Sequence, residues 1–176
     1  MSNRKIAGVV LAGGLSSRMG RDKARLDYHG RPMIDHMIGV LQSTGLDDIY
    51  VSGNYEGYRC IPDVELNEGP ARAICNVLQK LIGYDGILFV PVDMPLLNMK
   101  ALDLLIQQRE GGYFKDFPLP AFVTGQSPEK RVRSIKEFLS LVGIKPLTLP
   151  ADLVACMKNI NTPEEWKEVC ADECQD

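Results

Sequence analysis

The stretch IAGVVLAGGLSSRMGRDKA, residues 6–24, starts as a short apolar run and continues as a loop rich in glycine, serine and basic side chains. A continuous apolar run that ends at glycines predicts a β-strand buried on both faces. In the loop, Gly13 and Gly14 let the backbone turn sharply and bring its N–H groups close to a ligand, while Arg18 and Lys23 add positive charge. The stretch therefore predicts a phosphate-binding loop at the end of a buried strand, with a glycine-rich surface turn as the alternative.

Helix and strand patterns alternate along the rest of the chain. Apolar residues at helical spacing predict helices over residues 33–41, 70–82, 100–108 and 129–141, and a last helix that starts at Pro163 behind Thr162 as its N-cap. Short apolar runs predict strands over residues 49–51 and 86–90, one that begins beyond Pro120, and a short one just before Thr162. Residues 111–120 are expected to form an irregular edge.

This alternation is typical of an α/β fold with three layers, in which a mostly parallel sheet carries helices on both faces. Ligands bind such sheets in the crevice at the carboxyl ends of the strands. Functional residues are therefore expected in the loops after Val10, Val51 and Val90.

Length and composition limit the class of protein. A chain of 176 residues suits a single domain, residues 1–176. The net charge of −3 lacks the basic excess of a nucleic-acid binder, and no apolar stretch approaches the length of about 20 residues that spans a bilayer. Without a recognisable signal segment, a cytoplasmic location with no nucleic-acid or membrane partner is the expectation.

The five cysteines are scattered and form no CxxC pair, so neither a disulfide framework nor a zinc site is expected. Cys75 and Cys156 are interpreted as packing residues. Cys170 and Cys174 lie one helical turn apart near an acidic end, which could suit a soft metal but is more simply a terminal helix.

A second candidate site is the stretch FVPVDMPLL, residues 89–97, in which Asp93 follows the apolar strand 86–90. Magnesium bound to phosphates commonly takes one or two protein carboxylates, so an aspartate at the same sheet edge as the glycine loop is a natural ligand. The alternative is an ordinary turn or helix-capping aspartate. A phosphate-binding loop on the neighbouring strand end favours the metal.

Several motifs occur in the order and roughly at the spacing found in the molybdenum cofactor guanylyltransferase family: LAGGLSSRMGRDKA (11–24), GRP (30–32), GP (69–70), VDMPLL (92–97) and NINTPEE (159–165). The chain resembles this family over nearly its whole length. The resemblance implies a Rossmann-like fold of the nucleotide-diphospho-sugar transferase type and transfer of GMP from GTP to molybdopterin with release of pyrophosphate. Gly13-Gly14 after Leu-Ala is similar to the guanine-using branch, since the cytidylyltransferase branch usually reads LAAG.

The resemblance also implies roles for individual residues. Lys23, Arg18 and Asp93 would be catalytic, and Asp93 would hold Mg²⁺. Contacts to the nucleotide, the metal or the acceptor are implied for Leu11, Ala12, Gly13, Gly14, Lys23, Ser52, Asp63, Asp93, Asn159 and Asn161. The expected partners are GTP and molybdopterin as substrates and other proteins that make or receive the molybdenum cofactor.

The sequence departs from the family pattern at three places. Ser52 stands where a nucleotide-contacting asparagine is common, GPARA (69–73) replaces GPLAG, and the region before FPLPAF (117–122) is short. The triphosphate site is left largely intact, and the acceptor side is changed. Two alternatives therefore stay open, namely a nucleotidyltransferase that uses CTP or GTP with another phosphorylated acceptor, and a catalytically impaired GTP-binding accessory protein.

Overall fold

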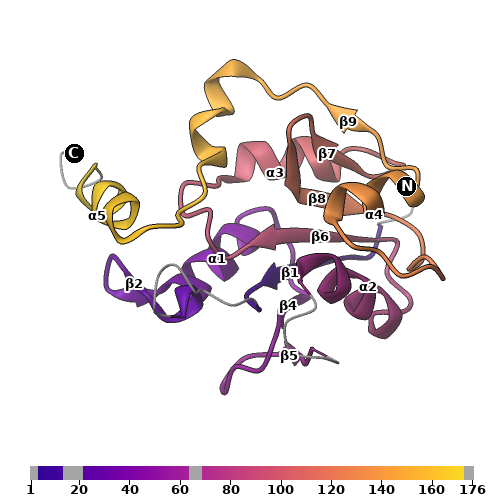
Figure 1. Cartoon of the computed structure of the whole chain (residues 1–176), viewed down its shortest axis with the longest axis horizontal. Helices are drawn as coiled ribbons and strands as arrows, with labels where there is room; N and C mark the ends of the chain where they lie inside the picture. Colours follow the sequence, from indigo (N-terminus) through magenta and orange to yellow (C-terminus); the bar gives the residue numbers. More distant parts are fainter. Residues whose placement is uncertain (1–3, 14–21, 64–68, 173–176) are drawn as a thin grey trace.

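The computed structural model describes residues 4–13, 22–63 and 69–172, and its main feature is a seven-stranded sheet with the order β5-β4-β1-β6-β8-β7-β9 (Figure 1). The strands are β1 (Ile6–Leu11), β4 (Ile49–Ser52), β5 (Cys60–Ile61), β6 (Gly86–Pro91), β7 (Gly112–Phe114), β8 (Phe117–Val123) and β9 (Pro146–Leu147). Among the paired strands of this sheet, β8 runs antiparallel to its neighbours and the other pairings are parallel. The expected mostly parallel sheet is confirmed.

Helices cover both faces of the sheet, as predicted. They are α1 (Met33–Gln42), α2 (Pro70–Lys80), α3 (Met99–Ile106), α4 (Ile135–Leu141) and α5 (Pro163–Asp172), with short 3₁₀ helices η1 (Lys23–Arg25), η2 (Ala151–Leu153) and η3 (Ala155–Met157) and a small hairpin of β2 (Asp27–Tyr28) and β3 (Arg31–Pro32). Val10 and Val90 belong to the apolar cluster that includes α1, α3 and α5, whereas Val9 and Phe89 belong to the cluster that includes α2 and α4. Neighbouring residues of one strand therefore enter opposite layers, which is the period of two that a strand imposes.

The prediction that the strand begins beyond Pro120 is wrong, because β8 starts at Phe117 and runs through two prolines. Its pairing with β6 involves only residues 121–123, so Pro118 and Pro120 are not required as donors on that side. On the other side the register with β7 shifts between Tyr113 and Phe114. Proline is tolerated at such an irregularity, where no ladder hydrogen bond is lost.

The helix predicted over residues 129–141 is shorter than expected. It begins only after Ser134, whose side chain accepts a hydrogen bond from the N–H of Glu137, while Glu137 Oε2 accepts one from the N–H of Arg133 at 2.8 Å. These two bonds form a capping arrangement that fixes the start of α4. Val132 is buried outside the helix, so its apolar spacing misled the prediction. In the same way α2 ends at Lys80, and Ile82 is exposed.

The C-terminal part matches the prediction in its helix but not in its strand. The residues just before Thr162 form no strand and follow two 3₁₀ turns instead. Thr162 Oγ1 accepts from the N–H of Glu165, and α5 begins at Pro163 as predicted. None of the helices formed by the described residues has the length and apolar character needed to cross a bilayer.

Candidate functional site

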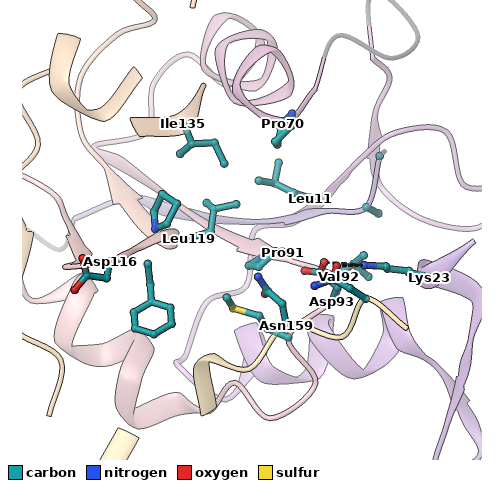
Figure 2. A pocket seen from close by; sticks show the side chains of 16 residues that line it. Leu11, Lys23, Pro70, Pro91, Val92, Asp93, Asp116, Leu119, Ile135 and Asn159 are labelled. Atoms are coloured by element: carbon teal, nitrogen blue, oxygen red, sulfur yellow. Dashed lines mark hydrogen bonds and ion pairs between the residues drawn. The ribbon is translucent and has the colours of Figure 1, made fainter. Parts of the chain in front are cut away.

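A pocket of about 720 Å³ opens at the carboxyl ends of β1 and β6, where the fold class predicts a ligand (Figure 2). The predicted site residues that line it are Leu11, Ala12, Gly13, Lys23, Asp93, Asn159 and Asn161. Leu11 and Pro91 pair at the ends of their adjacent strands, so the two loops that follow them face the same space. The structure thus brings the strand end at residues 11–13, Lys23, Asp93 and the two C-terminal asparagines together.

The Lys23 ammonium group is the centre of this arrangement. Its Nζ lies 3.0 Å from Asp93 Oδ2 and donates a hydrogen bond of 2.9 Å to Asn161 Oδ1. The exposed fractions of the Lys23 and Asp93 side chains are 16% and 23%, so the pair is largely but not fully withdrawn from water. Bonds between charged groups in such an environment are stronger than at an open surface.

Local structure places Lys23 at the start of η1. Asp22 caps this short helix, because its Oδ1 accepts a hydrogen bond of 3.0 Å from the N–H of Ala24. The cap fixes the backbone at the start of η1. Lys23 is therefore presented to the pocket by a defined turn.

Asp93 and Asn161 are held from the C-terminal side of the pocket. The N–H of Ile160 donates to the Asp93 carbonyl at 2.8 Å, which ties this segment to the aspartate loop. Glu165 Oε2 accepts hydrogen bonds from the N–H groups of Asn161 at 2.6 Å and Thr162 at 3.1 Å. The peptide N–H of Asn161 is the main cause that lowers the pKa of Glu165.

Ser52 and Asp63 are not among the residues that line the pocket. Ser52 is fully buried, and its Oγ donates to Asp63 Oδ1 at 3.2 Å. A Cβ atom added to Gly13 would lie only 2.5 Å from Asp63 Oδ2. Glycine at position 13 therefore lets the strand end approach Asp63 closely, which is the physical reason for a small residue there.

Two predicted site residues, Gly14 and Arg18, lie outside the described residues. Cys174, considered as part of a soft-metal pair with Cys170, lies outside them as well. Cys75 and Cys156 are free and buried, which confirms that they are packing residues. Burial raises the pKa of both thiols.

The oxygen atoms around Lys23 suit a hard cation. Asp93 Oδ2 and Asn161 Oδ1 already converge on one positive group, the Lys23 ammonium. Across residues 4–13, 22–63 and 69–172, no three His, Cys, Asp or Glu side chains are grouped as metal ligands, so a cation at Asp93 would need ligands from water, amide oxygens and a bound substrate. Magnesium at phosphate sites is held in this way, by one or two carboxylates plus the phosphates.

Sequence reasoning missed the opposite wall of the pocket. Phe117 and Leu119 line it from β8, Ile135 from the start of α4, and Asp116 from the turn between β7 and β8. Figure 2 shows Asp116 at the far end from Lys23. This wall is mostly apolar and comes from the region whose strand and helix boundaries were predicted wrongly. The prolines of FPLP were a signal of local irregularity but not of a ligand.

His29, His36 and Trp166 are not among the residues that line this pocket. His29 lies in an exposed turn with a φ of 51°. His36 Nε2 lies 2.7 Å from the carbonyl oxygen of Pro95 and so supports the aspartate loop from α1. Trp166 packs against the core beside Tyr28, with ring centroids 5.8 Å apart, as expected of a packing residue.

Comparison with known proteins identifies the family to which this chain belongs. Residues 8–159 match the model of the MobA-like NTP transferase domain. A molybdenum cofactor guanylyltransferase from Xanthomonas euvesicatoria is 34% identical over 94% of this chain and 95% of its own length. The similarity includes both strand ends that form the pocket.

Solved structures share the fold at low sequence identity. A nucleotidyl transferase from Methanothermobacter superposes with a TM-score of 0.78 at 15% identity, covering 98% of this chain and 99% of its own. The molybdopterin-guanine dinucleotide biosynthesis protein A from Archaeoglobus fulgidus gives a TM-score of 0.70 at 18% identity, covering 96% and 98%. These two structures therefore share the fold of this chain over nearly its whole length.

Proposed function

Because the chain belongs to the family of MobA-like NTP transferase domains, we propose that it is a molybdenum cofactor guanylyltransferase. The reaction is the transfer of GMP from GTP to the phosphate of molybdopterin, which releases pyrophosphate and gives molybdopterin guanine dinucleotide. Residues 1–176 would act as one nucleotidyltransferase domain, since the two apolar clusters pack on the two faces of one sheet.

The observation that carries the proposal is the contact of Lys23 with Asp93 at the carboxyl edge of adjacent strands. A cation from the glycine stretch and a carboxylate from the next strand end meet at 3.0 Å inside one pocket. A site for a metal-bound triphosphate needs this combination, because the phosphates require positive charge and the metal requires oxygen ligands. The pocket volume of about 720 Å³ is within the usual range for small-molecule sites.

The chemistry asks little of the protein beyond positioning and neutralisation of charge. An acceptor phosphate oxygen attacks the α-phosphorus in line with the departing pyrophosphate, so two anions meet at a centre that is already negative. No general base is needed, because a phosphate near neutral pH is already largely deprotonated. Lys23 would leave Asp93 and donate to the triphosphate, which stabilises the charge that develops on it.

Asp93 and Asn161 present the carboxylate and amide oxygens for a Mg²⁺ ion, which would supply further neutralisation of the triphosphate when bound. Asn159, which also lines the pocket, offers a carbonyl oxygen and an amide donor to the acceptor side. On the nucleotide side, the backbone of Leu11, Ala12 and Gly13 would contact GTP. Asp63, which accepts from Ser52, would lie directly against Gly13.

The test is a pyrophosphate-release assay on the purified protein with Mg²⁺ and GTP, with and without molybdopterin, in which mass spectrometry identifies the dinucleotide product. We expect pyrophosphate and product only when both substrates are present, and at least a hundredfold less with Asp93→Asn. Release only with a different phosphorylated acceptor would show the alternative transferase. Binding of GTP without any release would show an accessory protein, and a preference for CTP would contradict the assigned base.

A further inference from the structure

The hydroxyl group of Tyr55 lies between the two described ends of the glycine stretch. It donates to the carbonyl oxygen of Ala12 at 3.0 Å and shares its hydrogen with Asp22 Oδ1 at 3.3 Å. Ala12 lines the pocket, and Asp22 directly precedes Lys23. One hydroxyl therefore joins two points that are ten positions apart in the sequence, on either side of the predicted phosphate loop.

The surroundings of Tyr55 hold its ring in this position. Gly53 has a φ of +119°, and a Cβ atom added to it would lie 2.9 Å from Tyr55 Cε2, so the ring packs in the space that the missing side chain leaves. The Cys60 Sγ atom accepts from the N–H of Tyr55 at 3.3 Å and donates to its carbonyl at 3.1 Å. The Arg25 guanidinium lies over the ring at 5.8 Å from its centroid.

The hydroxyl is fixed as a donor. Burial is the main cause that raises the pKa of Tyr55, and the negative charge of Asp22 raises it further. The group therefore stays protonated throughout the physiological range, and the acceptors it needs are the carbonyl and the carboxylate that face it.

The hydrogen bond from Tyr55 to Asp22 also affects Lys23 indirectly. Asp22 Oδ1, which accepts from Tyr55, is the same atom that caps η1 by accepting from the N–H of Ala24. Lys23 lies between Asp22 and Ala24 in the sequence, and its side chain points to Asp93. The spacing between the Ala12-Gly13 backbone and the Lys23 ammonium is thus set through one tyrosine hydroxyl.

We infer that Tyr55 is a positioning residue for the triphosphate. Its hydrogen bonds to Ala12 and Asp22, here called the clasp, space the strand-end backbone and Lys23 for the nucleotide before it binds. The inference rests on the proposed function and assigns Tyr55 no contact with the reacting atoms. Loss of the clasp lowers the fraction of molecules that are ready to bind, and the apparent Kd for GTP rises by the inverse of that fraction. At saturating GTP the bound triphosphate itself orders Lys23, so kcat is largely kept.

The experiment compares Tyr55→Phe, which removes only the hydroxyl, with the matched control Tyr58→Phe. Tyr58 lies in the same loop, and its hydroxyl faces Asp35 instead of the glycine stretch. For Tyr55→Phe we expect the Kd and the KM for GTP to rise about tenfold, as loss of a hydrogen bond to a charged group implies, with kcat, the KM for the acceptor and the melting temperature close to those of the control. A merely structural role would move the melting temperature and both KM values together.

A double-mutant cycle with Asp22→Ala tests the clasp directly. In the Asp22→Ala protein the hydroxyl has lost one of its two ends, so adding Tyr55→Phe should raise the KM for GTP by less than about twofold. Unchanged GTP affinity in Tyr55→Phe, an equal rise in Tyr58→Phe, or full additivity in the cycle would overturn the inference while the wild-type reaction stands. A wild-type protein that neither binds nor uses GTP would overturn the proposed function and this inference with it.

Discussion

Replacing Lys23 with methionine removes the ammonium group and keeps a side chain of similar length. The change eliminates the two bonds of Lys23 Nζ, at 3.0 Å to Asp93 Oδ2 and 2.9 Å to Asn161 Oδ1. In the proposed reaction it also removes the fixed positive charge that faces the triphosphate. The variant therefore separates what Lys23 does for stability from what it does for catalysis.

The two effects differ greatly in size. A hydrogen bond to a charged group contributes about 1.5–3 kcal/mol when it is buried, but Asp93 keeps some access to water, so we expect Lys23→Met to lower the free energy of unfolding by only about 1–2 kcal/mol. For a chain of this size each kcal/mol shifts the melting temperature by about 2–4 °C. Loss of a group that stabilises transition-state charge lowers turnover by about 10²–10³-fold, which corresponds to about 2.7–4 kcal/mol.

The assay measures pyrophosphate release at saturating Mg²⁺ and GTP together with thermal unfolding of the same samples. A domain that is stable by about 5–15 kcal/mol stays almost fully folded after a loss of 1–2 kcal/mol, so reduced activity at 25 °C cannot come from unfolding. Lys100→Met is the control, because Lys100 is exposed and lies outside the pocket lining. Lys23→Met activity within about threefold of Lys100→Met would refute the assigned role, because Lys23 would then not stabilise the transition state.

Three further predictions concern Gly13 at the pocket, Glu165 below Asn161, and Phe122 in the core. Gly13→Ala brings a methyl group to within 2.5 Å of Asp63 Oδ2, so calorimetry should show GTP binding weakened about tenfold, and unchanged affinity would mean that Asp63 moves aside freely. The pKa of Glu165 is lowered from 4.5, so the ionised carboxylate stabilises the fold above pH 4.5 and loses this effect as the pH falls through the lowered pKa. Urea unfolding should therefore show Glu165→Gln to be less stable than the wild type near neutral pH and equally stable in acid. A difference in stability that does not depend on pH would contradict the assignment. Phe122→Ala empties a fully buried site and should cost about 3–5 kcal/mol in urea unfolding, and a cost below about 1 kcal/mol would show that the core is not packed as described.

The central part of the fold could be predicted because its signals are local. The apolar run of β1 and the helical spacing of α1 each identify an element without reference to the rest of the chain. The meeting of Lys23 and Asp93 followed from one rule, that loops after adjacent parallel strands share an edge, and β1 does lie next to β6.

The edges of the fold depend on contacts that no local pattern shows. Strands β5, β7 and β9 have two or three residues each and exist because longer partners pair with them. The start of α4 depends on the Ser134 cap, which competes with an apolar spacing that extends further back. Tyr55 was missed for the same reason, since its hydroxyl bonds to residues 43 and 33 positions away.

The apolar wall of the pocket, formed by Phe117, Leu119 and Ile135, could also not be predicted from the sequence. These residues come from β8 and α4, whose boundaries were predicted wrongly, so their common face could not be constructed. In the structure they give the pocket two unlike halves, one charged around Lys23 and one apolar. The charged half suits the triphosphate, and the apolar half is available for the ring system of a nucleotide or an acceptor.

The most direct test is a crystal structure of the protein with a non-hydrolysable GTP analogue and Mn²⁺, which anomalous scattering locates in place of Mg²⁺. We expect manganese to be bound by the Asp93 carboxylate and the triphosphate, with Lys23 Nζ turned from Asp93 to a phosphate oxygen. A triphosphate seated away from Lys23, or manganese bound without Asp93, would contradict it.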